Sequence, residues 1–155
     1  MTKSTGKTVR TGGCQCGAVR YALSAEPTHG SICHCRMCQK ALGNVFAALT
    51  GVKVGELTWT RGEPAIFKSS DLVERGFCRD CGTPLSFRYT DTDRIALTVG
   101  SFDDPAPLRM EIQYGVESRL PAFASLHALP EATSEEGVAP ERLARMASRQ
   151  HPDHD

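Results

Sequence analysis

The chain has 155 residues, of which 40% are hydrophobic and 23% charged, and this composition fits one globular domain with its own core. Eighteen basic and eighteen acidic residues give a formal net charge of +0, so the chain lacks the basic surplus that nucleic acids and anionic membranes attract. No stretch approaches the ~20 apolar residues of a spanning helix, and we expect neither a signal peptide nor an anchor in polar residues 1–7. We therefore expect a cytoplasmic protein without nucleic-acid or membrane partners.

The first part of the chain contains two cysteine groups, each beside a predicted element. Residues 1–10 are polar and are expected to form a flexible N-terminus. Cys14-Gln15-Cys16 follows two glycines, which permit a tight turn that aims two sulfurs at one point. Residues 18–23 are predicted to form a strand that leaves this turn. Cys33-His34-Cys35-Arg36-Met37-Cys38 precedes a predicted helical turn over residues 39–42, which the next glycine ends.

The middle of the chain consists of short segments separated by Gly and Pro, a pattern typical of an all-β domain. Strands are predicted at residues 45–50, 57–60, 65–68, 73–77, 85–89, 95–99 and 110–114. A third cysteine group, Cys78-Arg79-Asp80-Cys81, directly follows one of them. Beyond it we expect irregular structure over residues 117–130, a short helix within 138–147 with a proline in its first turn, and a frayed tail over 151–155.

The seven cysteines divide by spacing into a set of four and a set of three. Two thiolates on one turn supply half of a tetrahedral zinc shell, and a second turn closes it. A structural zinc is therefore predicted on Cys14, Cys16, Cys78 and Cys81. A second zinc is predicted on Cys33, Cys35 and Cys38. Three ligands leave one position open for water or a substrate, as in catalytic zinc sites, so we expect two Zn²⁺ ions per chain, with function at the second.

Other uses of the cysteines fit less well. A disulfide framework is disfavoured in a reducing compartment, and an odd number of thiols cannot all pair. The spacings do not follow those of iron–sulfur proteins, and buried inert thiols seldom cluster so closely in sequence. One alternative concerns the second zinc, which would be structural if His29, His127 or a carboxylate supplied a fourth ligand. His34 lies between two ligands that must point inward, so we expect its ring to point elsewhere and to have a structural role.

The predicted three-thiolate site favours thiol chemistry. Zinc bound by three thiolates is electron-rich, so it is a poor generator of hydroxide but a good platform for another thiolate. A small-molecule thiol is therefore the expected partner. Asn44 and Phe46, just after the triad, are the predicted side chains of the pocket wall, whereas Arg36 is interpreted as a solvated surface residue. No side chain is assigned as a general acid or base.

Five segments together carry a family resemblance: residues 12–21, 33–38, 74–83, 99–105 and 117–121. They resemble the glutathione-dependent formaldehyde-activating enzyme (GFA) family, which includes centromere protein V. The resemblance covers roughly residues 11–130 and sets off residues 131–155 as a C-terminal extension, partly helical or disordered. It implies an Mss4-like β-tent of stacked antiparallel sheets, stapled by zinc on the two cysteine sets.

The resemblance also implies an activity. Family members are described as condensing glutathione with formaldehyde to S-(hydroxymethyl)glutathione, formally a carbon–sulfur lyase reaction. The alternative is a non-catalytic, zinc-stabilised module that binds glutathione or a protein. Glutathione is the expected small-molecule thiol of the enzyme and of the glutathione-binding form of the alternative.

Overall fold

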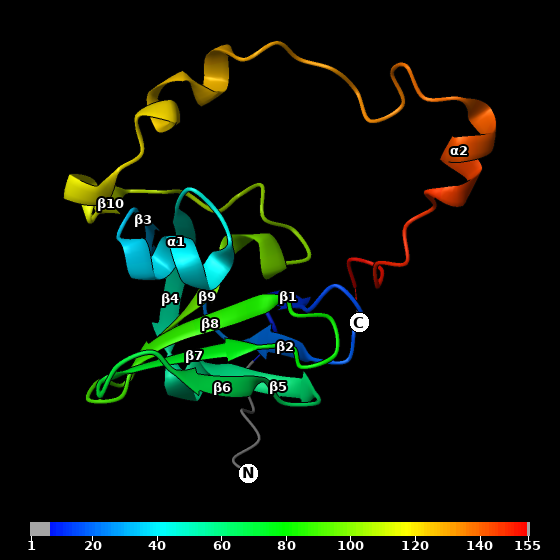
Figure 1. Ribbon diagram of the computed structural model, residues 1–155. Coiled ribbons are helices and arrows are strands. Elements are labelled where there is room, and N and C mark those ends of the chain that lie inside the picture. Colours follow the sequence, from blue (N-terminus) through cyan, green and yellow to red (C-terminus); the bar gives the residue numbers. More distant parts are fainter. Residues whose placement is uncertain (1–6, 155) are drawn as a thin grey trace.

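The protein is built from two β-sheets with little helix (Figure 1). The computed structural model describes residues 7–154, so part of the expected flexible N-terminus, residues 1–6, lies outside the described residues. The smaller sheet has the strand order β1-β2-β5, and the larger has the order β10-β3-β4-β9-β8-β7-β6. The mainly β fold with a short C-terminal helix, expected from the sequence, is confirmed.

The strands are short and mostly antiparallel. The three-stranded sheet contains β1 (Arg10–Gly13), β2 (Arg20–Leu23) and β5 (Leu57–Arg61). The seven-stranded sheet contains β10 (Ile112–Tyr114), β3 (Thr28–Cys33), β4 (Ala47–Lys53), β9 (Arg94–Thr98), β8 (Pro84–Tyr89), β7 (Val73–Phe77) and β6 (Ala65–Lys68). Only the β10–β3 pair, among the strands described, is parallel.

Helical segments connect and extend the sheets. The α-helices are α1 (Arg36–Leu42) and α2 (Pro140–Arg145), and the 3₁₀ helices are η1 (Val54–Glu56), η2 (Val99–Ser101), η3 (Val116–Ser118) and η4 (Pro121–Ala128). None of the helices within residues 7–154 is both long enough and apolar enough to cross a membrane.

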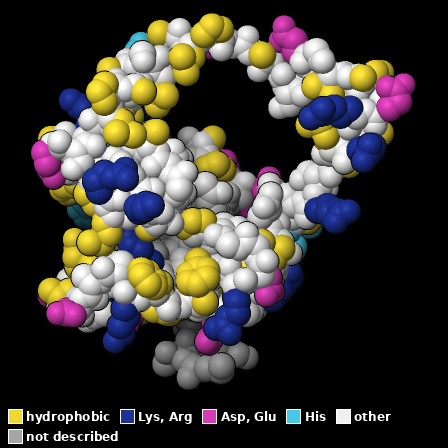
Figure 2. All heavy atoms as spheres, viewed as in Figure 1, with side chains coloured by type: hydrophobic (Ala, Val, Ile, Leu, Met, Phe, Trp, Pro, Cys, Tyr) yellow, Lys and Arg dark blue, Asp and Glu magenta, His cyan; other side chains and the backbone are white. Residues whose placement is uncertain are grey.

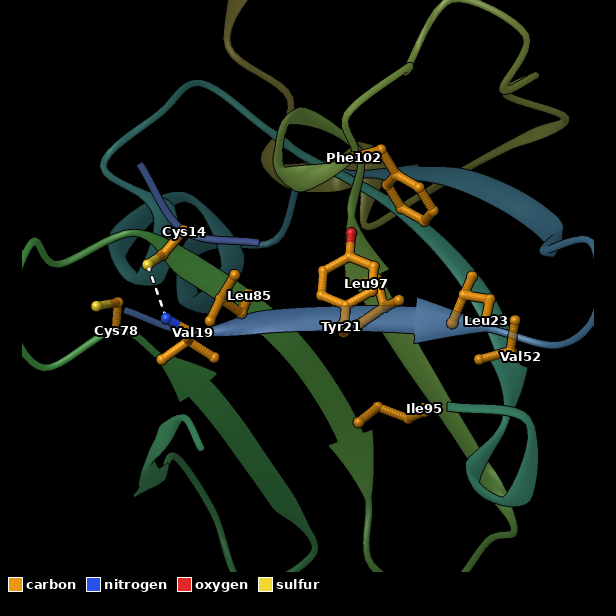
Figure 3. Close-up of a cluster of buried hydrophobic side chains, with 10 residues drawn as sticks. All are labelled: Cys14, Val19, Tyr21, Leu23, Val52, Cys78, Leu85, Ile95, Leu97 and Phe102. Atoms are coloured by element: carbon orange, nitrogen blue, oxygen red, sulfur yellow. Dashed lines mark hydrogen bonds between the residues drawn. The ribbon is translucent and has the colours of Figure 1, made fainter. Parts of the chain in front are cut away.

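The core lies between the two sheets (Figure 3). Tyr21 of β2 is fully buried, packs edge-on against Phe102 with 5.6 Å between ring centroids, and shares a 2.9 Å hydrogen bond with the Ser101 hydroxyl. Leu85 and Leu97 of the larger sheet are also fully buried in this cluster. Burying each such side chain contributes about 1.5–3 kcal/mol. The sulfurs of Cys14 and Cys78 lie together at one end of this cluster (Figure 3).

The other face of the larger sheet carries α1 and a second, smaller core. Cys38 of α1 packs with Ala47 and Leu49 of β4, and Phe87 and Ala96 flank this cluster. Strand register places Phe87 directly opposite both Ala96 and Arg75. The second cysteine set therefore lies on the face of the sheet that the smaller sheet leaves uncovered.

The C-terminal segment leaves the β body after β10 and forms a wide arc that returns beside β1 (Figure 1). Figure 2 shows open space between this arc and the body. The prediction of a frayed tail over residues 151–155 is wrong for the first of these residues. The His151 backbone N–H donates to the Gln15 carbonyl at 2.8 Å, and the His151 Nε2 lies 3.1 Å from Nη1 of Arg61.

Candidate functional site

The four cysteines predicted to hold a structural zinc meet at one point. The sulfurs of Cys14, Cys16, Cys78 and Cys81 all lie within 4.8 Å of one another. Sγ of Cys16 is 3.6 Å from Sγ of Cys14 and 3.8 Å from Sγ of Cys78. A tetrahedral ion with Zn–S bonds of about 2.3 Å requires sulfurs about 3.8 Å apart, whereas a disulfide requires about 2.05 Å. The spacing therefore fits a four-sulfur metal site and excludes disulfides.

Two matching turns build this site. Gly17 and Gly82 both have φ of +77°, a left-handed conformation that glycine adopts without steric cost. Their N–H groups close the turns by donating to the carbonyls of Cys14 at 3.1 Å and Cys78 at 2.9 Å. The Val19 N–H then points at Sγ of Cys14 from 3.3 Å. Each turn thus aims two sulfurs inward, as the glycine-flanked cysteine pairs predicted.

Local donors favour the ionised form of one of these thiols. Partial burial opposes ionisation of Cys81, but the hydroxyl and the backbone N–H of Thr83 outweigh it and lower the pKa of Cys81 to about 6. The two side chains are 3.1 Å apart. The surroundings of Cys81 thus favour the thiolate, which is the form that binds a metal ion.

The three remaining cysteines form a second cluster at the junction of β3 and α1. Cys33 ends β3, Cys35 caps α1, and Cys38 lies in its first turn, and their sulfurs lie within 4.8 Å of one another. Burial is the main cause that raises the pKa of Cys33 to about 12. At Cys35 burial is outweighed by donors that include the Cys38 N–H, 3.4 Å from its sulfur, so the pKa of Cys35 is lowered.

The triad has no fourth protein ligand in the part of the chain that the structure describes. Across residues 7–154, no histidine or carboxylate adds a ligand atom to the three-sulfur group. The fourth ligand considered above, from His29 or His127, is therefore not part of this group. The chain thus presents one complete four-sulfur set and one three-sulfur set, which can hold a metal with a position left open.

A buried arginine, which the sequence did not predict to be part of the site, contacts the triad. Arg75 of β7 is 7% exposed; its Nη2 lies 3.5 Å from Sγ of Cys38, and its guanidinium sits 4.9 Å from the Phe87 ring centroid. The Arg75 Nε donates a hydrogen bond to the Ser69 hydroxyl at 3.1 Å, which fixes the orientation of the guanidinium. Its positive charge would offset the negative charge of sulfurs that hold a metal ion. No local signal could reveal this contact, since Arg75 is 37 positions from Cys38.

His34 has the structural role that the sequence predicted. Its side chain is fully buried, and its Nε2 lies 2.8 Å from Oε1 of Gln113. The ring meets Phe46 and Phe123 edge-on, with centroids 6.2 and 4.7 Å away. His34 therefore anchors the start of the C-terminal segment rather than joining the sulfurs beside it.

One pocket opens directly onto the triad. It has a volume of about 590 Å³ and includes Cys33 and Cys38 in its lining. Asn44 and Phe46, the predicted wall residues, line a different hollow of about 280 Å³ that includes neither cysteine. Arg36 lines a third hollow and donates to Oε1 of Gln39. The pocket that opens onto the triad is thus formed mainly by β3, β4, β8 and β9, strands that were not predicted to line the site.

Comparison with known proteins agrees with this architecture. A family model described as "Glutathione-dependent formaldehyde-activating enzyme" matches residues 9–117. A Schizosaccharomyces pombe protein named an uncharacterized lyase is 31% identical over 80 residues, which cover 52% of this chain and 58% of that protein. A Phaeosphaeria nodorum protein named "Putative glutathione-dependent formaldehyde-activating enzyme" is 31% identical over 80 residues, or 50% of this chain and 42% of that protein. The chain spans about half the length of these curated relatives.

A solved structure shares the fold. The crystal structure of a Rhodobacter sphaeroides protein superposes with a TM-score of 0.54 at 20% identity, covering 66% of this chain and 98% of that one.

Proposed function

Because the chain belongs to the glutathione-dependent formaldehyde-activating enzyme family, we propose that it is a zinc-dependent enzyme of the carbon–sulfur lyase type that joins a thiol to an aldehyde. The reaction expected from the family is addition of the glutathione thiol to formaldehyde, giving S-(hydroxymethyl)glutathione. A carbon–sulfur bond forms, the carbonyl π bond breaks, and the thiol proton ends on the former carbonyl oxygen. No oxidant or reductant is needed.

The observation that carries the proposal is the contrast between the two cysteine sets. Four sulfurs form a complete shell beside the main core, whereas the other three form an incomplete shell at the junction of β3 and α1, where Cys33 and Cys38 line an open pocket. Zinc bound by the triad would supply a Lewis acid with one position that a thiol can take. We therefore assign Cys33, Cys35 and Cys38 to the reactive centre and the other four cysteines to the fold.

Residues around the triad would serve by charge and by positioning. Arg75, held against the Cys38 sulfur, offsets the negative charge that accumulates where several thiolates meet. The pocket holds the thiol beside its partner, and restriction of two reactants to one site lowers the entropic part of the barrier. The proton can pass through water.

A second candidate is a binding module for a thiol such as glutathione. It is favoured by the pocket lining, which contains no Asp or Glu and offers His29 as its one imidazole, about three strand steps away from the triad. Both candidates predict two zinc ions and a thiol at the triad, so catalysis itself must be measured.

The test is NMR exchange spectroscopy of the interconversion of glutathione and formaldehyde with S-(hydroxymethyl)glutathione. Wild type should accelerate exchange above the uncatalysed rate, and Cys35→Ser should abolish the acceleration. Met37→Ser is the matched control, because Met37 is an exposed residue of the same helix and belongs to neither cysteine group. Native mass spectrometry should find two zinc ions in wild type and one in Cys35→Ser. Equal exchange rates for wild type and Cys35→Ser would refute the enzymatic proposal, and thiol-dependent stabilisation without acceleration would favour the binding module.

A further inference from the structure

The pocket beside the triad contains two basic side chains that metal binding does not explain, His29 of β3 and Arg94 of β9. They are 65 positions apart in the sequence, but the fold brings them close together because a single strand, β4, separates β3 from β9 in the sheet. Neither belongs to a cysteine cluster.

His29 is held in a costly backbone conformation. Its φ of +56° makes it the single non-glycine residue with positive φ among residues 7–154. The β3–β4 register shifts between Thr28 and Ser31, so a bulge interrupts the strand at this point. Bulges redirect side chains and are frequent beside functional sites, where local strain is retained. Here the imidazole lines the pocket.

Arg94 is oriented by neutral acceptors alone. Its Nη2 donates to the Thr28 hydroxyl at 3.1 Å and to the Gly51 carbonyl at 3.3 Å. Within the described part of the chain, no carboxylate lies within ion-pair distance of its guanidinium. A Cβ on Gly51 would lie 3.3 Å from Nη2, so glycine lets the guanidinium rest close to β4. The result is a guanidinium held in a fixed orientation beside the pocket and free to meet an anionic ligand there.

The lining between the triad and these basic groups is mainly apolar, with Ser31 as the polar residue between His29 and Cys33 on β3. Leu49, Phe87, Ile95 and Ala96 contribute to it, and Tyr89 and Tyr114 flank it. The lining includes no Asp or Glu. His29 precedes Cys33 by four residues on β3, but the bulge takes up about one of these steps, so at about 3.3 Å per residue their Cα atoms lie about 10 Å apart. A ligand that touches both ends must therefore be elongated and apolar along its length.

We propose that the pocket binds thiols that carry a carboxylate at the far end of an apolar body, with the carboxylate on Arg94 and His29 and the thiol at the cysteine triad. The thiol end rests on the proposed function, whereas the carboxylate end does not. Glutathione supplies a thiol and carboxylates but also an ammonium group, for which the lining offers no acidic partner. We therefore expect glutathione to bind more weakly than a thiol whose single charge is a carboxylate.

The test compares glutathione and three simpler ligands by isothermal titration calorimetry with the zinc-loaded full chain. 8-Mercaptooctanoate carries both recognised ends, 8-mercapto-1-octanol has the same length without the charge, and octanoate has the carboxylate without the thiol. Charge-assisted hydrogen bonds should make the mercaptocarboxylate bind about tenfold more tightly than the mercaptoalcohol. Arg94→Gln should remove this difference and also the binding of octanoate. Lys53→Gln is the matched control, because Lys53 faces Arg94 across the strand pair but does not line the pocket.

The outcomes separate this inference from the proposed function. Equal affinities for the two thiols in wild type, unchanged by Arg94→Gln, would overturn the carboxylate subsite even if both thiols bind the triad. Glutathione binding more tightly than 8-mercaptooctanoate would overturn the proposed preference. Octanoate binding that Arg94→Gln removes and Lys53→Gln preserves would support the carboxylate subsite. If the same protein did not accelerate thiol–aldehyde exchange, the proposed function would fail but the subsite would stand.

Discussion

Replacing His29 by glycine should stabilise the fold while weakening the carboxylate subsite. An L-residue in the left-handed region costs about 1–2 kcal/mol, and His29 has φ of +56°. Glycine removes that cost but loses more backbone entropy on folding, about 0.5–1 kcal/mol. The His29 side chain is exposed, so little packing is lost. The difference leaves a net stabilisation of about 0.5–1 kcal/mol.

Urea denaturation of the zinc-loaded protein under reducing conditions measures this effect. Ser31→Gly is the matched control, because Ser31 lies on the same strand and lines the same pocket but does not have positive φ. It should lose about 0.5–1 kcal/mol, the usual cost of glycine in a strand. Octanoate affinity should fall in His29→Gly despite the gain in stability. If both glycine variants lost the same stability, the strain assigned to His29 would be refuted.

Three further predictions concern the metal sites and the core. Cys78→Ser should prevent stable folding or cost several kcal/mol, because the binding energy of a structural zinc is folding energy, whereas Cys35→Ser should remain folded with one zinc; circular dichroism and native mass spectrometry distinguish the two. Asp103→Asn should destabilise the fold at pH 7 by up to about 3–5 kcal/mol, because it removes the charge of one partner from a buried ion pair: Arg20 and Asp103 are 2.6 Å apart, with side chains 3% and 10% exposed. Burial opposes ionisation of Asp103, but hydrogen bonds from Arg20 and a neighbouring hydroxyl hold its pKa below the ordinary value, so its contribution is complete above pH ~4 and is lost as pH falls further. Thermal unfolding midpoints of wild type and Asp103→Asn should therefore converge below pH ~4, and a constant gap would contradict this. Arg75→Leu should weaken thiol binding by about tenfold while Arg75→Lys retains most of it; equal calorimetric affinities for all three proteins would show that the charge beside Cys38 is irrelevant.

The sequence predicted those parts of the structure that depend on residues close together in the chain. Cysteines two or three positions apart share a turn, so the division into four and three followed from spacing alone. The strand ending near Leu23 carries a local signal in its apolar alternation, and the helical turn predicted over residues 39–42 carries one in the glycine that ends it, although α1 begins three residues earlier, at Arg36. These elements lie where they were expected, within a few residues.

Elements without a local signal were missed. β1 consists of Arg10-Thr11-Gly12-Gly13, and two glycines hid its strand character. β3 contains one large apolar residue, Ile32, and a bulge at His29 breaks its alternation. The sequence predicts no strand where β3 lies, so its predicted pocket wall is near Asn44, just after the triad in the chain. The actual lining comes from the order of β3, β4, β9 and β8, which depends on long-range pairing.

The most direct test of the division into closed and open sites is ¹¹³Cd NMR of the cadmium-substituted protein. Two resonances are expected, one from each cysteine set, and titration with 8-mercaptooctanoate should shift only the resonance that Cys35→Ser removes. That result would show a complete four-sulfur site and a three-sulfur site that accepts a thiol. A single resonance, or two resonances that both stay fixed at saturating thiol, would contradict the account.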